Sequence, residues 1–416
     1  MAINKWLGTA TAVAQVDTFT PATIEATDIF TLTVTGYDGT SDSISYTAVD
    51  TSADTVSDAI VTLWNAETGS LFTGITASGT STVILTADTA GTGFKVASTT
   101  TDGGGADTQT FARVATTTNA GPNSWNTATN WSLGTVPGED AGGDGTEEVY
   151  VEDSSVEILY GLDNSGATYY LKSLHATKTY TGKIGWNGSG GLVGDYLQIK
   201  TSKAFIGEFF ESGRASGSGR IKIDYGDTAA DIIVYDTASS SDTNKSAYRM
   251  LANSASTNVK EIRSGSASIA AGTGETSTIG DTLISYELSV GTDATLSIGS
   301  GVTMGDLKCL GGTTFLKSSA DTIETRGGTL TISGSGTVTT MNAKGGKVIP
   351  VSSGTITTCN IDGATVDFTA SAEARTVTTL TLSSGLLQYD RDVVTIASKV
   401  EPVTGTGRTQ YRASTI

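Results

Sequence analysis

Four aspartates lie close together in a stretch that reads as two β-strands, and paired carboxylates are the groups that glycoside hydrolysis requires. They are Asp224, Asp227, Asp231 and Asp236. A glycosidase needs two carboxylates on one face, about 5 to 9.5 Å apart. The spacing of these four does not single out such a pair, and acids on the solvent-facing side of strands explain them equally well. We therefore predict no enzymatic activity and no catalytic residue, with glycan cleavage as the alternative.

Few other residues could support catalysis or hold a cofactor. His175 is the only histidine, so a Ser-His-Asp triad or a zinc site would have to use it, and no G-x-S-x-G turn accompanies it. The two cysteines, Cys309 and Cys359, are 50 residues apart without a C-x-x-C pairing, which argues against a disulfide framework. No phosphate-binding loop or dinucleotide fingerprint is present. We predict a structural or surface histidine, two buried thiols and no cofactor.

One loop, residues 139–148, is dense in carboxylates: Glu-Asp-Ala-Gly-Gly-Asp-Gly-Thr-Glu-Glu. Calcium takes about six to eight oxygen ligands, and this loop could supply several of them. The loop lacks the D-x-D-x-D-G spacing of an EF-hand. We therefore predict no metal site and favour a solvated acidic loop, while the sequence leaves calcium binding open.

Tryptophans supply the remaining candidate contacts. Trp125 and Trp131 lie six residues apart among Asn and Thr. They are expected to cover the open end of a strand stack, and the alternative is a platform on which a glycan stacks. Trp6 and Leu7 near the N-terminus are candidate attachment residues, because an aromatic side chain on an arm can anchor in a partner's pocket. The alternative for Trp6 is packing onto its own domain.

The composition favours extended β structure with many turns. The chain of 416 residues contains 51 Gly, only 5 Pro, and 16% charged residues. Its net charge of −18 would repel a polyanion, so we predict no nucleic-acid partner. No run approaches the roughly 20 apolar residues of a membrane span, and the N-terminus lacks a secretory pattern. We expect folding in a cytoplasm and no membrane association.

The first 115 residues are expected to form a small α+β module. Strand-like runs begin at Ile29 and Ile44, and two more follow around 82–86 and 94–98. Between them, apolar residues from Val56 to Trp64 recur at helical spacing. This order predicts a ββαββ unit in which Ile60, Leu63 and Trp64 pack on a sheet.

A degenerate repeat marks the C-terminal part, residues 258–416, and residues 116–257 form a further β-rich region. A phrase of threonines around one aliphatic residue recurs, followed each time by a glycine step. Its copies are 322–325, 337–340, 355–358 and 376–379. Spacings of 15, 18 and 21 residues are typical of one coil of a β-solenoid. We predict a mainly β chain with a β-solenoid-like or β-helix-like domain, in which Ile323, Val338, Ile356 and Val377 form one inward ladder. The alternative is a β-sandwich.

Three blocks resemble phrases in phage-encoded structural proteins. They are residues 123–137, 157–162 and 180–185. The W-x4-N-W-x2-G-x2-P phrase in the first block also occurs in secreted bacterial β-helical repeat proteins. The module at 16–115 resembles small domains of phage virion proteins, so the resemblance covers most of residues 1–200. It implies a virion component and supplies no catalytic residue.

The resemblance implies a capsid decoration protein, head fibre or spike. Its N-terminal module would attach to other virion proteins, such as the major capsid or a tail protein, and the β-rich part would project. A homotrimer is expected, folded in the host cytoplasm and then located on the virion. The alternatives are a tailspike-type protein that binds or depolymerises a host surface glycan, and a bacterial surface adhesin, which the missing secretory pattern disfavours.

Overall fold

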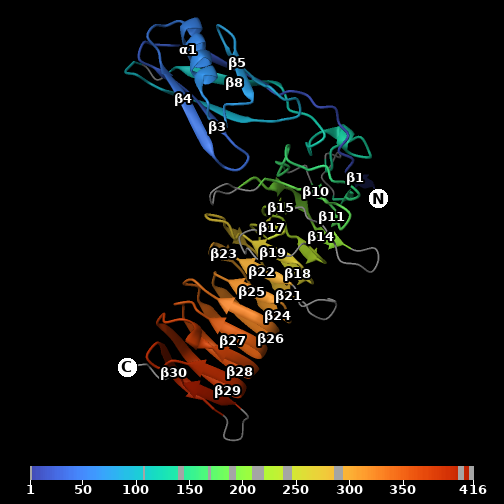
Figure 1. Cartoon of the computed structure of the whole chain (residues 1–416), viewed down its shortest axis with the longest axis vertical. Coiled ribbons are helices and arrows are strands. Elements are labelled where there is room, and N and C mark those ends of the chain that lie inside the picture. The colour runs from blue at the N-terminus through green and yellow to red at the C-terminus, as the bar shows by residue number, and fades with distance from the viewer. Residues whose placement is uncertain are drawn as a thin grey trace.

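The computed structural model describes residues 2–105, 108–138, 145–166, 170–186, 194–208, 220–237, 246–284, 294–401 and 407–411. Within these residues the protein is mainly β with one α-helix, as predicted. A small module lies at one end, and strands are stacked from it along the long axis toward the C-terminal end (Figure 1). Two separate hydrophobic cores correspond to these two parts.

The N-terminal module contains two antiparallel sheets and one helix. The four-stranded sheet has the order β5 (Ile75–Ser78), β6 (Val83–Ala87), β2 (Val16–Ala22), β8 (Thr110–Thr117). The three-stranded sheet has the order β4 (Ser41–Thr47), β3 (Ile29–Thr35), β7 (Lys95–Thr101). The predicted ββαββ order is therefore wrong, because the module has two further strands, β2 and β8, that the prediction does not contain. Both strands are rich in threonine and bury few apolar residues, which weakens their alternating pattern.

The predicted helix is confirmed as α1 (Ala53–Ala66). Its N-terminus is capped by the Ser52 side chain, which accepts a hydrogen bond from the Thr55 backbone N–H. Trp64 is buried and donates its indole N–H to the Ile75 carbonyl at 2.9 Å. Leu63, in contrast, is 38% exposed. The prediction that Leu63 packs on the sheet is wrong, because the buried helix face passes through Val56, Ile60 and Trp64.

The first strand does not belong to this module. Strand β1 (Ile3–Lys5) pairs in parallel with β9 (Glu148–Val151) in the second part of the chain. The chain then leaves the second part at Val13 and returns to it at Ala120. The backbones of these two residues hydrogen-bond at 2.7 Å. The N-terminal module, residues 13–120, is thus inserted into the second part, and the predicted unit of residues 1–115 does not match it at its start.

The second part, called the strand stack below, consists chiefly of two ladders of parallel strands. The first ladder runs through β9, β11 (Ser173–Thr177), β14 (Lys203–Glu208), β16 (Asp231–Val234), β18 (Asn258–Ile262), β21 (Thr282–Ile284) and β24 (Leu307–Cys309). The second runs through β12 (Leu197–Gln198), β15 (Ile221–Asp224), β17 (Tyr248–Leu251), β19 (Ser266–Ile269), β22 (Thr295–Ile298) and β25 (Thr313–Leu316). Two short pairs add to them: β10 (Tyr170–Leu171) with β13 (Lys200–Thr201), and β20 (Ser277–Thr278) with β23 (Val302–Thr303).

The two ladders join in long strands near the C-terminus. These are β26 (Ala320–Ile332), β27 (Val338–Pro350), β28 (Ile356–Asp367) and β29 (Arg375–Tyr389). Strands β24 and β25 both pair with β26, and at the far end β30 (Val394–Val400) and β31 (Arg408–Tyr411) both pair with β29. Each long strand therefore spans both ladders and binds them into one body.

The predicted inward ladder is correct for three of its four members. Val338, Ile356 and Val377 lie in register on successive strands, and all are buried. Ile323 is buried as well but aligns with Met341, and Ala320 takes the position beside Val338. The aligned positions on β26 and β27, Ala320 and Val338, are thus 18 residues apart, whereas the first two threonine phrases are 15 residues apart. The phrase before Gly327 therefore lies three positions out of register with the phrase on β27.

Glycines occupy the bend within each long strand, as the sequence predicts. Gly328, Gly346, Gly363 and Gly385 have φ values of +69°, +73°, +104° and +93°, a region that L-residues with a Cβ rarely adopt. The bends also lie directly against one another. A Cβ on Gly346 would lie 2.6 Å from the carbonyl oxygen of Gly328. Glycine is therefore required there both for its φ and for the close approach of the next repeat.

Replacing Ile356 by Asp should destabilise the strand stack by several kcal/mol, since a buried carboxylate would have no partner. The control is Thr357→Asp at the exposed neighbouring position, which should change stability by roughly 0.5 kcal/mol or less. Denaturant unfolding followed by circular dichroism measures both. Equal effects of the two substitutions would contradict the buried position of Ile356.

Replacing Gly346 by Ala should cost more than replacing Gly134 by Ala. Gly134 has a similar φ of +69° but no neighbouring atom within 4 Å of an added Cβ. Gly134→Ala should lose about 1 to 2 kcal/mol from the left-handed conformation alone. Gly346→Ala adds the collision with Gly328, so its midpoint for thermal unfolding should be clearly lower. A lower midpoint for Gly134→Ala would show that close stacking does not constrain the bend.

Candidate functional site

The junction between the N-terminal module and the strand stack is built around Tyr37. This residue lies in the turn between β3 and β4, where the sequence Tyr-Asp-Gly predicts a hairpin end. Its ring stacks on Trp186 at 5.5 Å between centroids and meets Tyr160 edge-on at 5.1 Å. Trp186 and Tyr160 belong to the strand stack. One aromatic side chain of the module is thus held between two of the stack.

Asp195 fixes this arrangement through three contacts. Its backbone N–H donates to the Tyr37 carbonyl at 3.0 Å, and its own carbonyl accepts the Trp186 N–H at 2.8 Å. Its carboxylate forms an ion pair with Lys95 of β7. The Lys95 ammonium also lies 4.6 Å from the Tyr37 ring centroid. Two backbone hydrogen bonds and an ion pair therefore converge on Asp195 of the strand stack.

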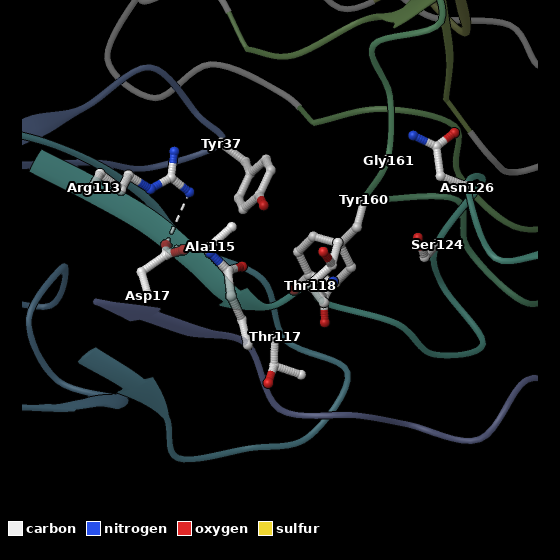
Figure 2. Close-up of a pocket in the computed structure, with 12 residues that line it drawn as sticks. Asp17, Tyr37, Arg113, Ala115, Thr117, Thr118, Ser124, Asn126, Tyr160 and Gly161 are labelled. Atoms are coloured by element: carbon white, nitrogen blue, oxygen red, sulfur yellow. Dashed lines mark hydrogen bonds and ion pairs between the residues drawn. The ribbon is translucent and has the colours of Figure 1, made fainter. Parts of the chain in front are cut away.

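A polar cavity of about 190 Å³ opens beside this aromatic contact. Figure 2 shows Asp17, Arg113 and Tyr37 on the module side, and Ser124 and Asn126 on the side of the strand stack. Alternation along β2 and β8 directs the Asp17 and Arg113 side chains toward each other, and β8 leads directly to the returning connection. The cavity exists only because the module is held against the stack.

The polar groups of this cavity are incompletely paired within the described residues. Asp17 is fully buried, and its Oδ2 accepts hydrogen bonds at 2.9 Å from both Arg113 and Gln15. Its Oδ1 has no partner, nor has either side-chain amide atom of Asn119, although all three atoms are buried. Buried polar atoms are normally hydrogen-bonded, so these three are unpaired groups inside the walls of the junction, without surface open to the cavity.

The two tyrosines beside the cavity remain neutral over the ordinary pH range. Burial, reinforced by Tyr160 and Asp195, raises the pKa of Tyr37 well above its usual value. Burial likewise raises the pKa of Tyr160. Their hydroxyls therefore stay protonated and can donate as well as accept hydrogen bonds.

A second buried cluster lies beneath Trp186. The Lys222 ammonium, on the fully buried side chain, donates to the Trp186 carbonyl and lies 4.2 Å from the Tyr196 ring centroid. Glu275 accepts hydrogen bonds from Tyr196 at 2.8 Å and from Arg249 at 2.7 Å. Burial, with the Arg249 charge adding to it, lowers the pKa of Lys222 to about 7. The cluster supports the backbone of Trp186, whose ring stacks on Tyr37.

The structure separates the four aspartates that raised the question of glycosidase chemistry. Asp224 and Asp227 line a small cavity of about 130 Å³, and burial raises the pKa of Asp224. Asp227 is largely exposed and lies 4.0 Å from the Lys200 ammonium. Asp231 pairs with Lys260 on the first ladder, while Asp236 is buried beyond the end of β16. Only Asp224 and Asp227 therefore share a cavity.

The tryptophans for which a glycan contact was the alternative, and the one proposed for attachment, are in the core. Trp125 and Trp131 are 0% and 2% exposed, with ring centroids 4.6 Å apart, so their faces are not open to a sugar. Trp6 is 2% exposed and meets Trp131 edge-on at 5.1 Å. The burial argues against the alternative of a glycan platform at Trp125 and Trp131. It also argues against attachment through Trp6, which packs within its own chain. Leu7 alone is exposed, at 44%.

The asparagine between these tryptophans explains the W-x4-N-W phrase. The buried Asn130 side chain donates to the carbonyls of Gly121 and Ser124 at 2.7 and 2.8 Å. Its oxygen accepts the Ala10 N–H at 2.8 Å. The outgoing and returning connections of the module are thus held together by one side chain. The phrase is a structural clamp, and it covers the end of the strand stack as predicted.

His175 is buried between aromatic rings of the strand stack, not on the surface, which was one of the two positions expected for it. It is 7% exposed and lies between the rings of Tyr150 and Phe205, with centroids 4.3 and 4.7 Å away. Its Nε2 lies 2.9 Å from the Ser173 hydroxyl. Because this histidine stacks in register with aromatic residues on β9 and β14, its ring is used for packing between strands.

The two cysteines are free and buried in the inward ladders, as predicted. Burial raises the pKa of Cys309 to about 11 and that of Cys359 to about 12.

Most of the acidic loop, residues 139–144, lies outside the described residues. In the described part of the chain, no three His, Cys, Asp or Glu side chains are grouped to hold a metal ion. Among the described helices, none has the length and hydropathy to cross a membrane.

Comparisons with protein-family models, with curated proteins and with solved structures find no match to this chain.

The lowered pKa of Lys222 predicts a specific pH dependence. Its pKa is about 7 in the folded protein and near 10.5 when unfolded, so the unfolded chain binds one more proton between these values. The free energy of unfolding should therefore rise with pH across this range, by at most about 1.4 kcal/mol per pH unit. Lys222→Met should lack this contribution.

The measurement is the difference in unfolding free energy between the wild type and Lys222→Met, between about pH 7.5 and about pH 9. Groups other than Lys222 titrate in both proteins and cancel in the difference. A difference that stays constant or falls with pH would mean that the pKa of Lys222 is not lowered in the folded protein.

Proposed function

We propose that this chain is a structural component of a bacteriophage particle: a capsid decoration protein, head fibre or spike. In this proposal the two parallel ladders form a β-solenoid that projects from the particle. The N-terminal module attaches to another particle protein, such as the major capsid or a tail protein. The protein folds in the host cytoplasm and is then located on the virion.

The observation that carries the proposal is the unbroken first ladder. Twelve strands from β9 to β30 follow one another in parallel register. At roughly 4.8 Å per strand, they span about 50 Å. Apolar side chains fill the interior along this whole length. A stiff extended body of this kind suits a spacer or projection on a particle surface.

The attachment surface is proposed on the module rather than on Trp6. Val49 is 71% exposed and Val114 is 60% exposed, although both are apolar. Leu7, at 44%, lies where the chain leaves the stack for the module. Single exposed apolar residues are common on protein surfaces. The exposure of Val49, Val114 and Leu7 is nevertheless consistent with a contact between the module end and another particle protein.

A second candidate function is a tailspike-type protein that binds or depolymerises a host surface glycan. The cavity beside Tyr37 favours the binding form, because aromatic and polar residues line it. The depolymerising form has less support, since of the four aspartates only Asp224 and Asp227 line one cavity.

Antibodies against the full chain test the location. They should label purified phage particles in immunogold electron microscopy, at regular positions on the head or tail. Particles from a mutant phage lacking this gene provide the control. Detection of the chain only in the soluble fraction of lysed cells, with unlabelled particles, would remove the proposal.

The expected oligomer is a homotrimer, because symmetric association covers exposed surfaces of such chains. Multi-angle light scattering should then give a mass three times the 42.5 kDa of one chain. The measurement should be repeated over a wide range of concentrations. A mass of one chain throughout would contradict the trimer.

A further inference from the structure

We propose that one uncharged outer face of the strand stack joins copies of this chain into the homotrimer. The face lies on β27, β28 and β29 before their glycine bends, and on β30. These strands are neighbours at the C-terminal end of the stack (Figure 1). The inference rests on the homotrimer expected above and identifies the surface that forms it.

Two columns of side chains make up this face, which is called the uncharged patch below. The first column contains Thr340, Thr358, Thr379 and Ser398, which are in register on the four strands. None of the four is buried. Parallel pairing repeats them about every 4.8 Å along the stack. The column therefore presents hydroxyl groups at a regular spacing on the outside of the stack.

The second column lies two residues further along each strand and contains Asn342, Asn360, Thr381 and Val400. Asn360 donates its amide N–H to Asn342 Oδ1 at 2.9 Å, so the two amides continue along the stack as a ladder. Val400 ends the column and is 52% exposed although it is apolar. Neither column contains a charged side chain, and the second ends in an apolar side chain that a partner would cover.

Charge favours a second copy of this chain as the occupant of the patch. The chain carries a net charge of −18, so two copies repel each other wherever their acidic faces meet. The patch avoids this repulsion, while the same strands carry a Lys347–Asp367 ion pair beyond the bend. At the border with β26, Glu324 pairs with Lys344 at 3.1 Å. An uncharged centre with charged groups at its border is the usual anatomy of an interface.

The regular spacing favours copies that lie parallel and level with one another. An identical chain presents the same repeat, so hydroxyl and amide groups can meet equivalent groups at every strand. A partner without this repeat would match the patch at only one or two strands. Cyclic symmetry about an axis parallel to the stack keeps equivalent strands level. It also places all the N-terminal modules at one end, where attachment to a particle requires them.

The size of the patch predicts a concentration-dependent assembly. Four strands about 4.8 Å apart, with about five residues each at roughly 3.3 Å, cover roughly 300 Å². One partner of a stable interface contributes about 800 Å². Contacts centred on the patch should therefore be weak, and the wild type should change from one chain to three over the range of about 1 to 100 μM.

The test places a charge at the centre of the patch. By light scattering at about 100 μM, the wild type should contain three chains and Thr358→Asp one, because three carboxylates would be brought together. The matched control is Thr365→Asp, which adds the same charge to the same strand at another half-buried position, beyond the bend. It should keep the wild-type mass. Circular dichroism checks that both variants are folded.

A cysteine variant tests the level arrangement independently. Oxidation should link Thr340→Cys chains to one another, because equivalent residues lie at one height. An antiparallel contact would instead link Thr340→Cys to Thr379→Cys chains in a mixture of the two. The native Cys309 and Cys359 are buried and their pKa values are raised, so they do not compete.

The possible failures are distinguishable. A wild-type trimer that Thr358→Asp leaves intact would overturn the patch but not the trimer. A wild type that is a single chain at all concentrations would overturn both, and immunogold labelling would still decide the particle assignment. Cross-linking in the mixture alone would overturn the parallel arrangement. Single wild-type chains that bind gene-deleted particles, with binding lost in Thr358→Asp but kept in Thr365→Asp, would assign the patch to another particle protein and overturn the proposal.

Discussion

The structure depends on parallel pairing in register, because this pairing places equivalent side chains of successive strands directly on one another. An inward position must then be apolar in every repeat, as Val338, Ile356 and Val377 are. A bend must also recur at the same place in each repeat, and Gly328 and Gly346 lie one over the other there. The abundance of glycine, threonine and small aliphatic residues follows from this constraint.

The same constraint explains how the other part of the molecule is attached. A stack of parallel strands must end in an uncovered strand, and at the N-terminal end β1 and the cluster of Trp6, Trp125 and Trp131 provide the cover. The module is inserted between Trp6 and Trp125 of this cluster, so both of its connections leave from the covered end. Asn130 holds them together, and Asp195 then fixes the module's hairpin against the stack. The polar cavity is a consequence of these two anchors.

Much of the fold could be predicted from the sequence, because it is encoded in local periodicity. The helix of the module and the glycine bends were recognised from the spacing of a few neighbouring residues. The register at Ile323 was missed because a threonine phrase displaced by three positions still puts an aliphatic side chain inside. Strand β1 was missed because three residues carry no period. The cavity could not be predicted at all, since Asp17, Asn119 and Tyr160 come together only through the insertion.

The two ends of the strand stack differ in a way that bears on its partners. At the N-terminal end the last strand is covered by β1 and aromatic side chains, whereas at the other end β30 and β31 are the final described strands. These edge strands carry charge: Lys399 pairs with Glu401 at 2.6 Å, and Arg408 begins β31. Charged side chains on an edge disfavour further strand addition, because pairing would bury them. Strand addition at these described strands is thereby opposed.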